Sequence, residues 1–518
     1  ERAVQVHDRL DVHDQPLAPG RHPLLDEQVG RVDHQVRLER DAHMAAARGD
    51  DVGAEGQVGD ELAVHHVPLD PVDAGLLERQ ALLTETREVR REHRGSDEDG
   101  AAGHGPDDSG GVSDIDLDLV IDGVVAGGDG LAREPAGRVV FVAGALPGER
   151  VLARPAQVKK GFVRASLSRV IDPSPDRVAP PCPHVAEGCG GCGWQHVAPA
   201  AQRTLKADIV ADAIRRIGKV GVPPIDLGPQ LTPLGYRTTV RIAVRDGRAG
   251  FRHARSHDIV GVDRCLVAHP LIDELIADGR FGEANEVVLR CGTATGERLA
   301  VVHPKLDDEV TLPDDVTVVG ADDLRRGRRA WFHEEVGGRR WRISASSFFQ
   351  TRTDGAEALV DVVRREVGAT PQSLADLYCG VGLFAGLIPS ARVIAVDSSA
   401  SAVHDARHNL GNDDERDVTV VHADVSAWKP SPAEVVVADP SRAGLGREAV
   451  GRVAATHAER VVLVSCDAAA LGRDAGLLAE HGYTLAAVTL VDLFPHTPHL
   501  EAVARFELES PRVGRAML

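Results

Sequence analysis

Residues 373–384 have the sequence Ser-Leu-Ala-Asp-Leu-Tyr-Cys-Gly-Val-Gly-Leu-Phe, an apolar strand that runs into a Gly-x-Gly turn and then a helix. Such a turn lets a cofactor lie against the backbone, because glycine has no side chain to keep it away. Downstream, apolar strands continue to alternate with helices. This alternation predicts a doubly wound, Rossmann-like α/β domain over residues 346–518.

A second apolar strand, residues 392–397 (Arg-Val-Ile-Ala-Val-Asp), ends in an acidic side chain about fifteen residues after the turn. Asp397 is therefore placed where a carboxylate can accept both hydroxyls of an adenosine ribose. Gly-x-Gly alone is weak support, but the strand, the turn and the acid together favour a nucleoside cofactor. A nicotinamide-binding loop usually has a third glycine where this chain has Ala385, so S-adenosylmethionine is the better candidate.

Three further segments bring reactive side chains to the carboxyl ends of strands, where such sheets place their chemistry. Asp439 follows an apolar strand and begins an Asp-Pro turn. Cys466 ends another strand just before a helix, whose N-terminal dipole would help to lower the pKa of the thiol. Glu501 follows a loop with two histidines. Each feature alone is ambiguous, because buried cysteine often serves as a small apolar residue and histidine often has a structural hydrogen bond.

Residues 112–176 contain short β runs broken by glycine, which predict a small barrel of about five strands. Lys159, Lys160 and Arg164 place positive charge on one hairpin of this barrel. The pattern resembles a TRAM domain, an OB-like RNA-binding module. The alternative is a solvated basic hairpin on a purely structural barrel.

Four cysteines in the next segment form a candidate metal site: Cys182, Cys189, Cys192 and Cys265. Thiolates on glycine-rich loops can surround one metal centre, and backbone amides near the sulfurs suit a cubane iron–sulfur cluster. Four cysteines would equally suit tetrahedral zinc. We therefore expect a metal centre in a central α+β domain, residues 177–345, and the spacing leaves the metal open.

The central segment has two other patterns. Apolar side chains recur at every fourth position in residues 200–218 (Leu205, Ile209, Ala213 and Ile217), which predicts an amphipathic helix with this face toward the core. Arginines punctuate a strand-rich stretch after residue 236 and form a basic run at residues 325–329 (Arg-Arg-Gly-Arg-Arg). Such arginines could hold phosphate, although solvated surface arginines are about as common.

The bulk composition is that of a globular protein, with 43% hydrophobic and 27% charged residues in a chain of 518. We find no apolar run long enough to span a membrane and no secretion signal, and seven cysteines are too few for a disulfide scaffold. These features predict a cytoplasmic protein with reduced thiols and no membrane partner. They do not predict an oligomeric state.

The first 111 residues differ from the rest of the chain. They contain no Phe, Trp, Tyr, Ile, Lys, Asn or Cys, and they hold roughly −13 of the net charge of −20. A segment of this composition can hardly build a core. We expect residues 1–111 to be a disordered acidic tail or a non-native extension translated in the wrong frame, and we assign them no function.

Several motifs taken in order resemble the RNA 5-methyluridine (uracil-C5) methyltransferase family. They are Ser-Phe-Phe-Gln350, Asp-Leu-Tyr378-Cys-Gly-Val-Gly, Asp439-Pro-Ser-Arg-Ala-Gly, Ser-Cys466-Asp and Phe-Pro-His-Thr-Pro-His-Leu-Glu501, and the resemblance extends from about Ser113 to about Leu508. It implies a class I fold that binds S-adenosylmethionine and methylates carbon 5 of a uridine in RNA. By the resemblance, Cys466 is the nucleophile and Glu501 the base.

The resemblance also implies the binding residues. The S-adenosylmethionine site would be lined by Gln350, Tyr378, Asp397 and Asp439. In some family members a [4Fe-4S] cluster is held by cysteines that correspond to Cys182, Cys189, Cys192 and Cys265. Two positions depart from the family pattern: Leu383 stands where an asparagine is frequent, and Asp467-Ala468 follows the cysteine where Asn-Pro is common.

Other functions remain open from the sequence. Ribosomal RNA, 23S rRNA in particular, is the favoured substrate because the barrel and the cysteine cluster occur together, and transfer RNA is the alternative. A catalytically inactive RNA-binding protein is a different reading, for which Leu383 is the main hint. A zinc-stabilised DNA cytosine methyltransferase is a third interpretation, which the RNA-type barrel disfavours.

Overall fold

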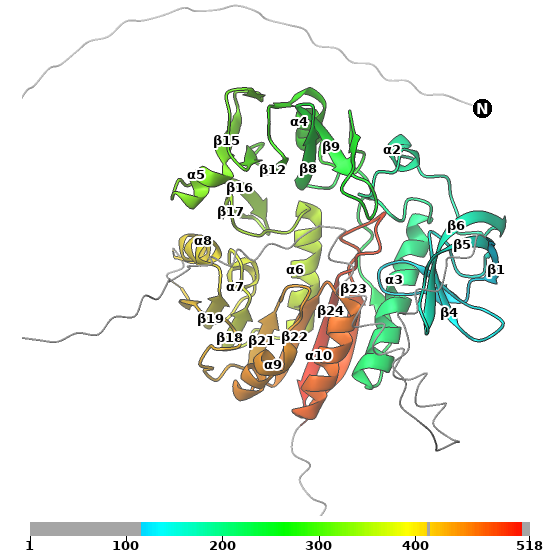
Figure 1. Cartoon of the computed structure of the whole chain (residues 1–518). Helices are drawn as coiled ribbons and strands as arrows, with labels where there is room; N and C mark the ends of the chain where they lie inside the picture. Colours follow the sequence, from blue (N-terminus) through cyan, green and yellow to red (C-terminus); the bar gives the residue numbers. More distant parts are fainter. Residues whose placement is uncertain (1–114, 412–414, 510–518) are drawn as a thin grey trace, which may run out of the picture. The chain divides into compact units, whose positions relative to one another are not determined.

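The computed structural model describes residues 115–411 and 415–509 (Figure 1). The predictions about residues 1–111 lie outside this range. Within it, no helix has both the length and the apolar character needed to cross a bilayer.

The N-terminal strands close into a barrel. They are β1 (Leu117–Val120), β2 (Gly123–Val124), β3 (Gly130–Arg133), β4 (Val139–Ala143), β5 (Arg150–Val158) and β6 (Phe162–Asp172). The strand order is β1-β5-β6-β4-β3-β2, and the two edge strands, β1 and β2, are consecutive parts of one bent segment. The sheet therefore closes on itself as a barrel of five strands. Val140, Val151 and Ala165 are among the apolar side chains that fill the interior. The predicted barrel is therefore observed, and its assignment as a TRAM domain stays a prediction.

The central sheet has the order β10-β9-β8-β12-β13-β15. Its strands are β8 (Thr239–Arg245), β9 (Arg248–Arg252), β10 (Ile259–Gly261), β12 (Glu286–Cys291), β13 (Arg298–His303) and β15 (Val316–Gly320). The smaller elements of this region are α2 (Pro183–Ala186), α4 (Pro270–Asp278), β11 (Arg280–Phe281), β14 (Val310–Thr311), α5 (Ala321–Arg325), β16 (Trp331–Val336) and β17 (Arg339–Ser344). Strands β16 and β17 form an antiparallel hairpin, called the 331–344 hairpin below.

The large sheet has the order β20-β19-β18-β21-β22-β24-β23-β7. Its strands are β18 (Ser373–Leu377), β19 (Arg392–Asp397), β20 (Asp417–His422), β21 (Val435–Ala438), β22 (Arg460–Ser465), β23 (Tyr483–Leu490), β24 (Ala502–Leu508) and β7 (Ile225–Leu227). Strands β18 to β22 pair in parallel, and β24 runs antiparallel between β22 and β23. The chain order reverses between β18 and β21, which is where open α/β sheets bind their ligands.

Helices cover both faces of the large sheet (Figure 1). They are α3 (Pro199–Ala213), α6 (Thr353–Val367), α7 (Leu383–Leu387), α8 (Ala400–Leu410), α9 (Gly446–Ala455) and α10 (Ala468–Glu480). Along β21, Val436 and Ala438 belong to the apolar core with α3, α9 and α10, whereas Val435 and Val437 belong to the core with α6, α7 and α8. Alternate residues thus face opposite cores, which explains the continuous apolar run of this strand.

One part of the predicted central segment packs on the large sheet. Strand β7 pairs with β23, and α3 packs against α10 and β23. The buried side chains of α3 include Gln202 and Lys206, whereas Leu205 is half-buried. The predicted apolar positions contact the core, because Ile209 and Ala213 are buried and Leu205 and Ile217 pack against the same cluster. The sequence did not predict the polar side chains that are buried beside them.

Candidate active site

The Gly-x-Gly turn follows β18 at the reversal point of the large sheet. Gly380 and Gly382 have φ angles of 55° and 93°, and Tyr378 also has a positive φ of 60°. This conformation is costly for a residue with a side chain, so the surroundings must hold Tyr378 in place. Asp376 on β18 is fully buried, and its Oδ2 accepts a hydrogen bond from the Ala385 amide at 2.7 Å, which ties the turn to the strand. Burial raises the pKa of Asp376 to about 8.

Asp397, the predicted ribose ligand, lies beside this turn at the end of β19. Its Oδ2 accepts a hydrogen bond from the Gly380 amide at 2.9 Å, and its Oδ1 accepts one from the Ser399 amide at 2.7 Å. Each carboxylate oxygen has a further lone pair for a ligand hydroxyl. Leu383, one of the two departures from the family pattern, is buried in the apolar core.

Gln350 and Asp439 meet although they are 89 positions apart, because Gln350 Nε2 donates a hydrogen bond to Asp439 Oδ2 at 3.3 Å. The backbone amide of Asp439 donates to the Leu377 carbonyl at 3.2 Å, so Asp439 lies at the same edge as the Gly-x-Gly turn. Burial raises the pKa of Asp439 to about 7. Near neutral pH this carboxyl is consequently divided between its protonated and ionised forms.

Cys466, the predicted nucleophile, lies between β22 and α10. Asp467 caps the helix, since its Oδ1 accepts a hydrogen bond from the Ala470 amide at 2.7 Å, so the second departure from the family pattern has a local structural role. Burial raises the pKa of the Cys466 thiol well above its ordinary value, and the carboxyls of Glu501 and Asp439 raise it further. The contribution of the α10 dipole stays a prediction, and the net pKa of the thiol is raised because of burial and the neighbouring acids.

Glu501, the predicted base, comes immediately before β24 and is 4% exposed. Its Oε1 has no hydrogen-bond partner among the described residues. Burial raises the pKa of Glu501 well above its ordinary value and Asp439 raises it further, whereas Arg442 lowers it. Arg442 also lowers the pKa of Cys466, so these four groups share one electrostatic environment. Sequence reasoning gave Arg442 no role, although it follows the Asp-Pro turn directly.

The loop that leads to Glu501 is held by buried polar side chains of α3, which sequence reasoning also missed. Lys206 Nζ donates to Asp492 Oδ1 at 2.6 Å. Gln202 Oε1 accepts a hydrogen bond from the His496 amide at 2.6 Å. Both α3 side chains are fully withdrawn from water, so they fix the loop from inside the protein.

The four predicted metal ligands line one pocket together with Gln195 and Arg237; they are Cys182, Cys189, Cys192 and Cys265. Burial raises the pKa of each of three of these thiols, and that of Cys265 rises to about 11. In the part of the chain that the structure describes, no group of three or more His, Cys, Asp or Glu side chains is arranged to hold a metal ion. The four predicted ligands therefore lie around one pocket, and the metal centre itself stays a prediction.

No protein-family model matches the chain. An uncharacterised RNA methyltransferase of Streptomyces avermitilis is 35% identical over 76% of this chain and 98% of that protein. The 23S rRNA (uracil(1939)-C(5))-methyltransferase RlmD of Alkalilimnicola ehrlichii is 33% identical over 76% of this chain and 97% of that protein. The crystal structure of Pyrococcus abyssi tRNA (uracil-54, C5)-methyltransferase with S-adenosyl-L-homocysteine matches with a TM-score of 0.59 at 24% identity, over 75% of this chain and 100% of that one, which shows a common fold.

The strand order of the large sheet, the Gly-x-Gly turn beside Asp397 and the reactive groups at the same edge define a class I S-adenosylmethionine-dependent methyltransferase. The relatives identify a family within this class, because they are named RNA methyltransferases and match the chain over about three quarters of its length. The chain belongs to the RNA 5-methyluridine (uracil-C5) methyltransferase family.

Proposed function

We propose that this enzyme methylates carbon 5 of a uridine in RNA, with 23S rRNA as its substrate, through a covalent bond between Cys466 and carbon 6. The main support is that Cys466, Glu501 and Asp439 influence one another's protonation at one buried edge of the large sheet. The relative that is 33% identical is named for a uracil of 23S rRNA, which favours ribosomal over transfer RNA.

The role of Cys466 follows from the weak nucleophilicity of carbon 5 in uracil. Addition of a thiolate to carbon 6 pushes electrons toward carbon 5, which can then accept a methyl group. When bound, S-adenosylmethionine supplies that methyl group in electrophilic form. Because a paired uridine cannot reach a buried thiol, the target base must be in a loop or be flipped out of its helix.

Glu501 completes the reaction by removing the proton of carbon 5. The electron pair of the broken C–H bond restores the ring double bond, the bond between sulfur and carbon 6 breaks, and Cys466 leaves as a thiolate. A carboxylate with a raised pKa is a stronger base than an ordinary glutamate. The high pKa of Glu501 therefore suits this role.

Four residues would hold the cofactor in this scheme: Gln350, Tyr378, Asp397 and Asp439. Asp397 is suited to the ribose hydroxyls, because both of its oxygens are already oriented by backbone amides. Gln350 is hydrogen-bonded to Asp439, which contacts the strand before the Gly-x-Gly turn and influences the protonation of Cys466 and Glu501. This arrangement would orient the methyl group toward the base.

The pocket lined by Cys182, Cys189, Cys192 and Cys265 would hold a [4Fe-4S] cluster with a structural role. Its support is the donor set, four thiols around one pocket, and the same donors would suit zinc. Anaerobic purification followed by iron, sulfide and zinc analysis decides between them. About four iron and four sulfide per chain is the expected result; stoichiometric zinc, or no metal at all, contradicts it.

The function is tested by mass-spectrometric nucleoside analysis of ribosomal and transfer RNA from cells with and without this protein. We expect loss of 5-methyluridine from ribosomal RNA. Loss from transfer RNA would reassign the substrate. Unchanged levels in both pools, together with failure of the purified protein to bind radiolabelled S-adenosylmethionine, would instead indicate an RNA-binding protein without this activity.

A further inference from the structure

Trp331 is exposed in a chain that has few aromatic residues. The chain has four tryptophans, all among the described residues; Trp194, Trp341 and Trp428 are at most 5% exposed, whereas Trp331 is 44% exposed. The one other aromatic among the exposed large hydrophobic residues of the described chain is Phe348, which follows the same hairpin. An exposed indole loses the stabilisation that burial would provide, and aromatic rings at surfaces are frequent binding anchors.

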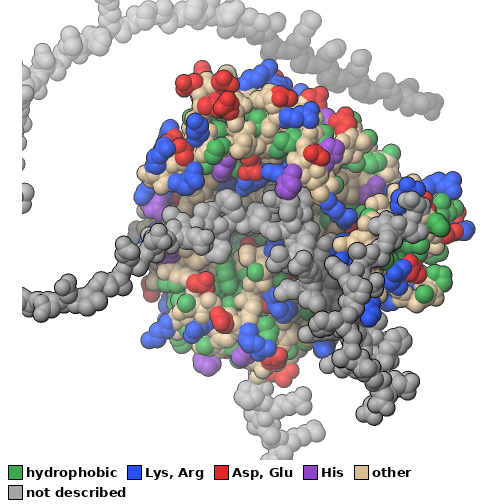
Figure 2. Space-filling model, in the orientation of Figure 1, with side chains coloured by type: hydrophobic (Ala, Val, Ile, Leu, Met, Phe, Trp, Pro, Cys, Tyr) green, Lys and Arg blue, Asp and Glu red, His purple; other side chains and the backbone are tan. Residues whose placement is uncertain are grey.

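The surface next to Trp331 is basic. The residues before it, 325–329, include four arginines, and Figure 2 shows Lys and Arg side chains over α5 and the neighbouring hairpin. Arg325 is exposed and has no partner within the described residues. Arg326 and Arg328 pair with Asp322 and Asp323, but these two arginines are 72% and 56% exposed, and such surface pairs contribute little.

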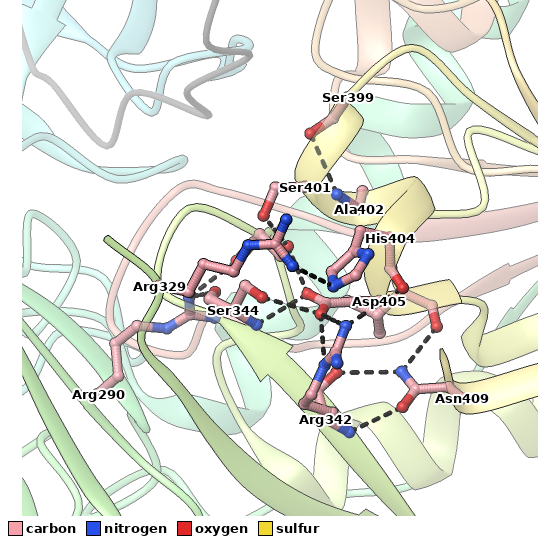
Figure 3. Close-up of polar contacts among 12 residues, drawn as sticks. Arg290, Arg329, Arg342, Ser344, Ser399, Ser401, Ala402, His404, Asp405 and Asn409 are labelled. Carbon is pink, nitrogen blue, oxygen red and sulfur yellow. Dashed lines mark hydrogen bonds and ion pairs between the residues drawn. The ribbon is translucent and has the colours of Figure 1, made fainter. Parts of the chain in front are cut away.

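A guanidinium stacks on the indole of Trp331. Arg342 lies over the Trp331 ring at 5.8 Å from its centroid. Arg342 Nε in turn donates to Asp405 Oδ1 at 2.9 Å, and Asp405 is fully buried on α8 (Figure 3). Arg329 reaches His404 on the same helix, with 3.1 Å between Arg329 Nη1 and His404 Nε2. Two arginines therefore connect this region to α8, which begins three residues after the predicted ribose ligand Asp397.

We propose that Trp331 and the arginines of residues 325–329 form a platform for unpaired RNA, on which one base stacks on the indole while the arginines contact its phosphates. This inference rests on the proposed function and extends it, because the platform would hold a nucleotide that flanks the target uridine. A rigid aromatic ring beside unpaired positive charge fits a nucleotide better than an apolar protein surface. Stacking needs an unpaired base, so duplex RNA should not use the platform.

The position of Trp331 as the one exposed tryptophan gives a direct test. Acrylamide should quench a red-shifted part of the protein fluorescence, and Trp331→Phe should abolish that part, which assigns it to this residue. A short single-stranded RNA oligonucleotide should then protect the fluorescence from acrylamide, whereas the same strand in a duplex should not. If single-stranded RNA binds in a filter assay and the quenching is unchanged, or if it does not bind, the platform is refuted.

Variants separate stacking from charge. Trp331→Ala should weaken binding of the single strand about tenfold or more, and Trp331→Phe should restore most of it. Arg325→Ala should lower the salt dependence of binding by about one phosphate contact. The matched control Arg447→Ala removes an arginine of α9 that is 72% exposed and pairs with Glu480. This control should change neither the affinity for the single strand nor the salt dependence of binding. Equal effects of Arg325→Ala and Arg447→Ala would refute the role of the basic run.

The proposed function can fail independently of the platform. RNA that protects Trp331 without being methylated at carbon 5 would support the platform and refute the proposed reaction. RNA that is methylated but whose binding does not protect Trp331 from acrylamide would support the proposed reaction and refute the platform.

Discussion

Asp405 and Glu501 are both withdrawn from water, at 0% and 4% exposed, but their partners differ. The oxygens of Asp405 accept hydrogen bonds from Arg342 Nε, from the amide and hydroxyl of Ser344, and from the hydroxyl of Ser347 (Figure 3). Glu501 has an oxygen without a partner in the described chain and a second acid, Asp439, nearby. A buried carboxylate surrounded by donors holds structure in place, whereas one with an unsatisfied oxygen and a raised pKa binds a proton more strongly and is suited to act as a base.

This comparison predicts that changes at the catalytic edge affect turnover, while changes around Asp405 affect stability. The largest effect should come from Cys466→Ala, which removes the nucleophile and should reduce methyl transfer to the level without enzyme. The fold should persist, as measured by circular dichroism and the melting temperature. Cys291→Ala, which alters a buried cysteine of the central sheet, is the matched control and should keep turnover. Methylation by Cys466→Ala would contradict the mechanism.

The next largest effect should come from Glu501→Gln. Addition and methyl transfer come before the lost proton abstraction, so turnover should fall by about 10²–10⁴-fold while a covalent protein–RNA adduct accumulates. Denaturing gel electrophoresis with labelled RNA detects the adduct. Glu507→Gln, on the strand β24 that follows Glu501 and paired with Arg460 and Arg505, should behave like the unaltered enzyme. Without an adduct, Glu501 is not the base.

Asp405→Ala should act on stability. It leaves the partly buried Arg342 and the donors of Ser344 and Ser347 without their acceptor, which should cost about 3–5 kcal/mol of unfolding free energy. Urea denaturation measures the change. Asp361→Ala, in a pair whose acid is 75% exposed, is the control and should stay within about 0.5 kcal/mol. A loss at Asp405 no larger than at Asp361 would mean that the network holds nothing in place.

The elements that the sequence predicted well are those with a local signal. Strand β19 has the predicted bounds, residues 392–397, because an apolar run between polar ends needs no distant contact to be identified. The turn after β18 also has a local signal, because its two glycines readily adopt the positive φ angles that the turn requires. Both place Asp397 correctly relative to the turn, and the geometry of the cofactor edge was therefore accessible from the sequence.

The features that were missed depend on residues far apart in the chain. Lys206 is buried because Asp492, 286 positions away, neutralises it, so no pattern within α3 could show that this polar side chain is inside. The pKa of Cys466 depends on burial and on two acids that are distant in the sequence, which no local pattern shows. Long-range charge pairing was therefore the part that sequence reasoning could not supply.

The smallest effect that we predict is a pH dependence of the reaction, which tests whether the buried groups at the catalytic edge influence one another's pKa values. The pKa values of both Cys466 and Glu501 are raised, and both groups react in their deprotonated forms, so the single-turnover rate should rise with pH through neutrality, each group contributing up to about tenfold per unit. Because the Glu501 carboxylate raises the thiol pKa, Glu501→Gln should shift the pH dependence of adduct formation to lower pH. A rate that falls as pH rises from neutral, or an unshifted profile in Glu501→Gln, would mean that the two groups do not share one buried environment.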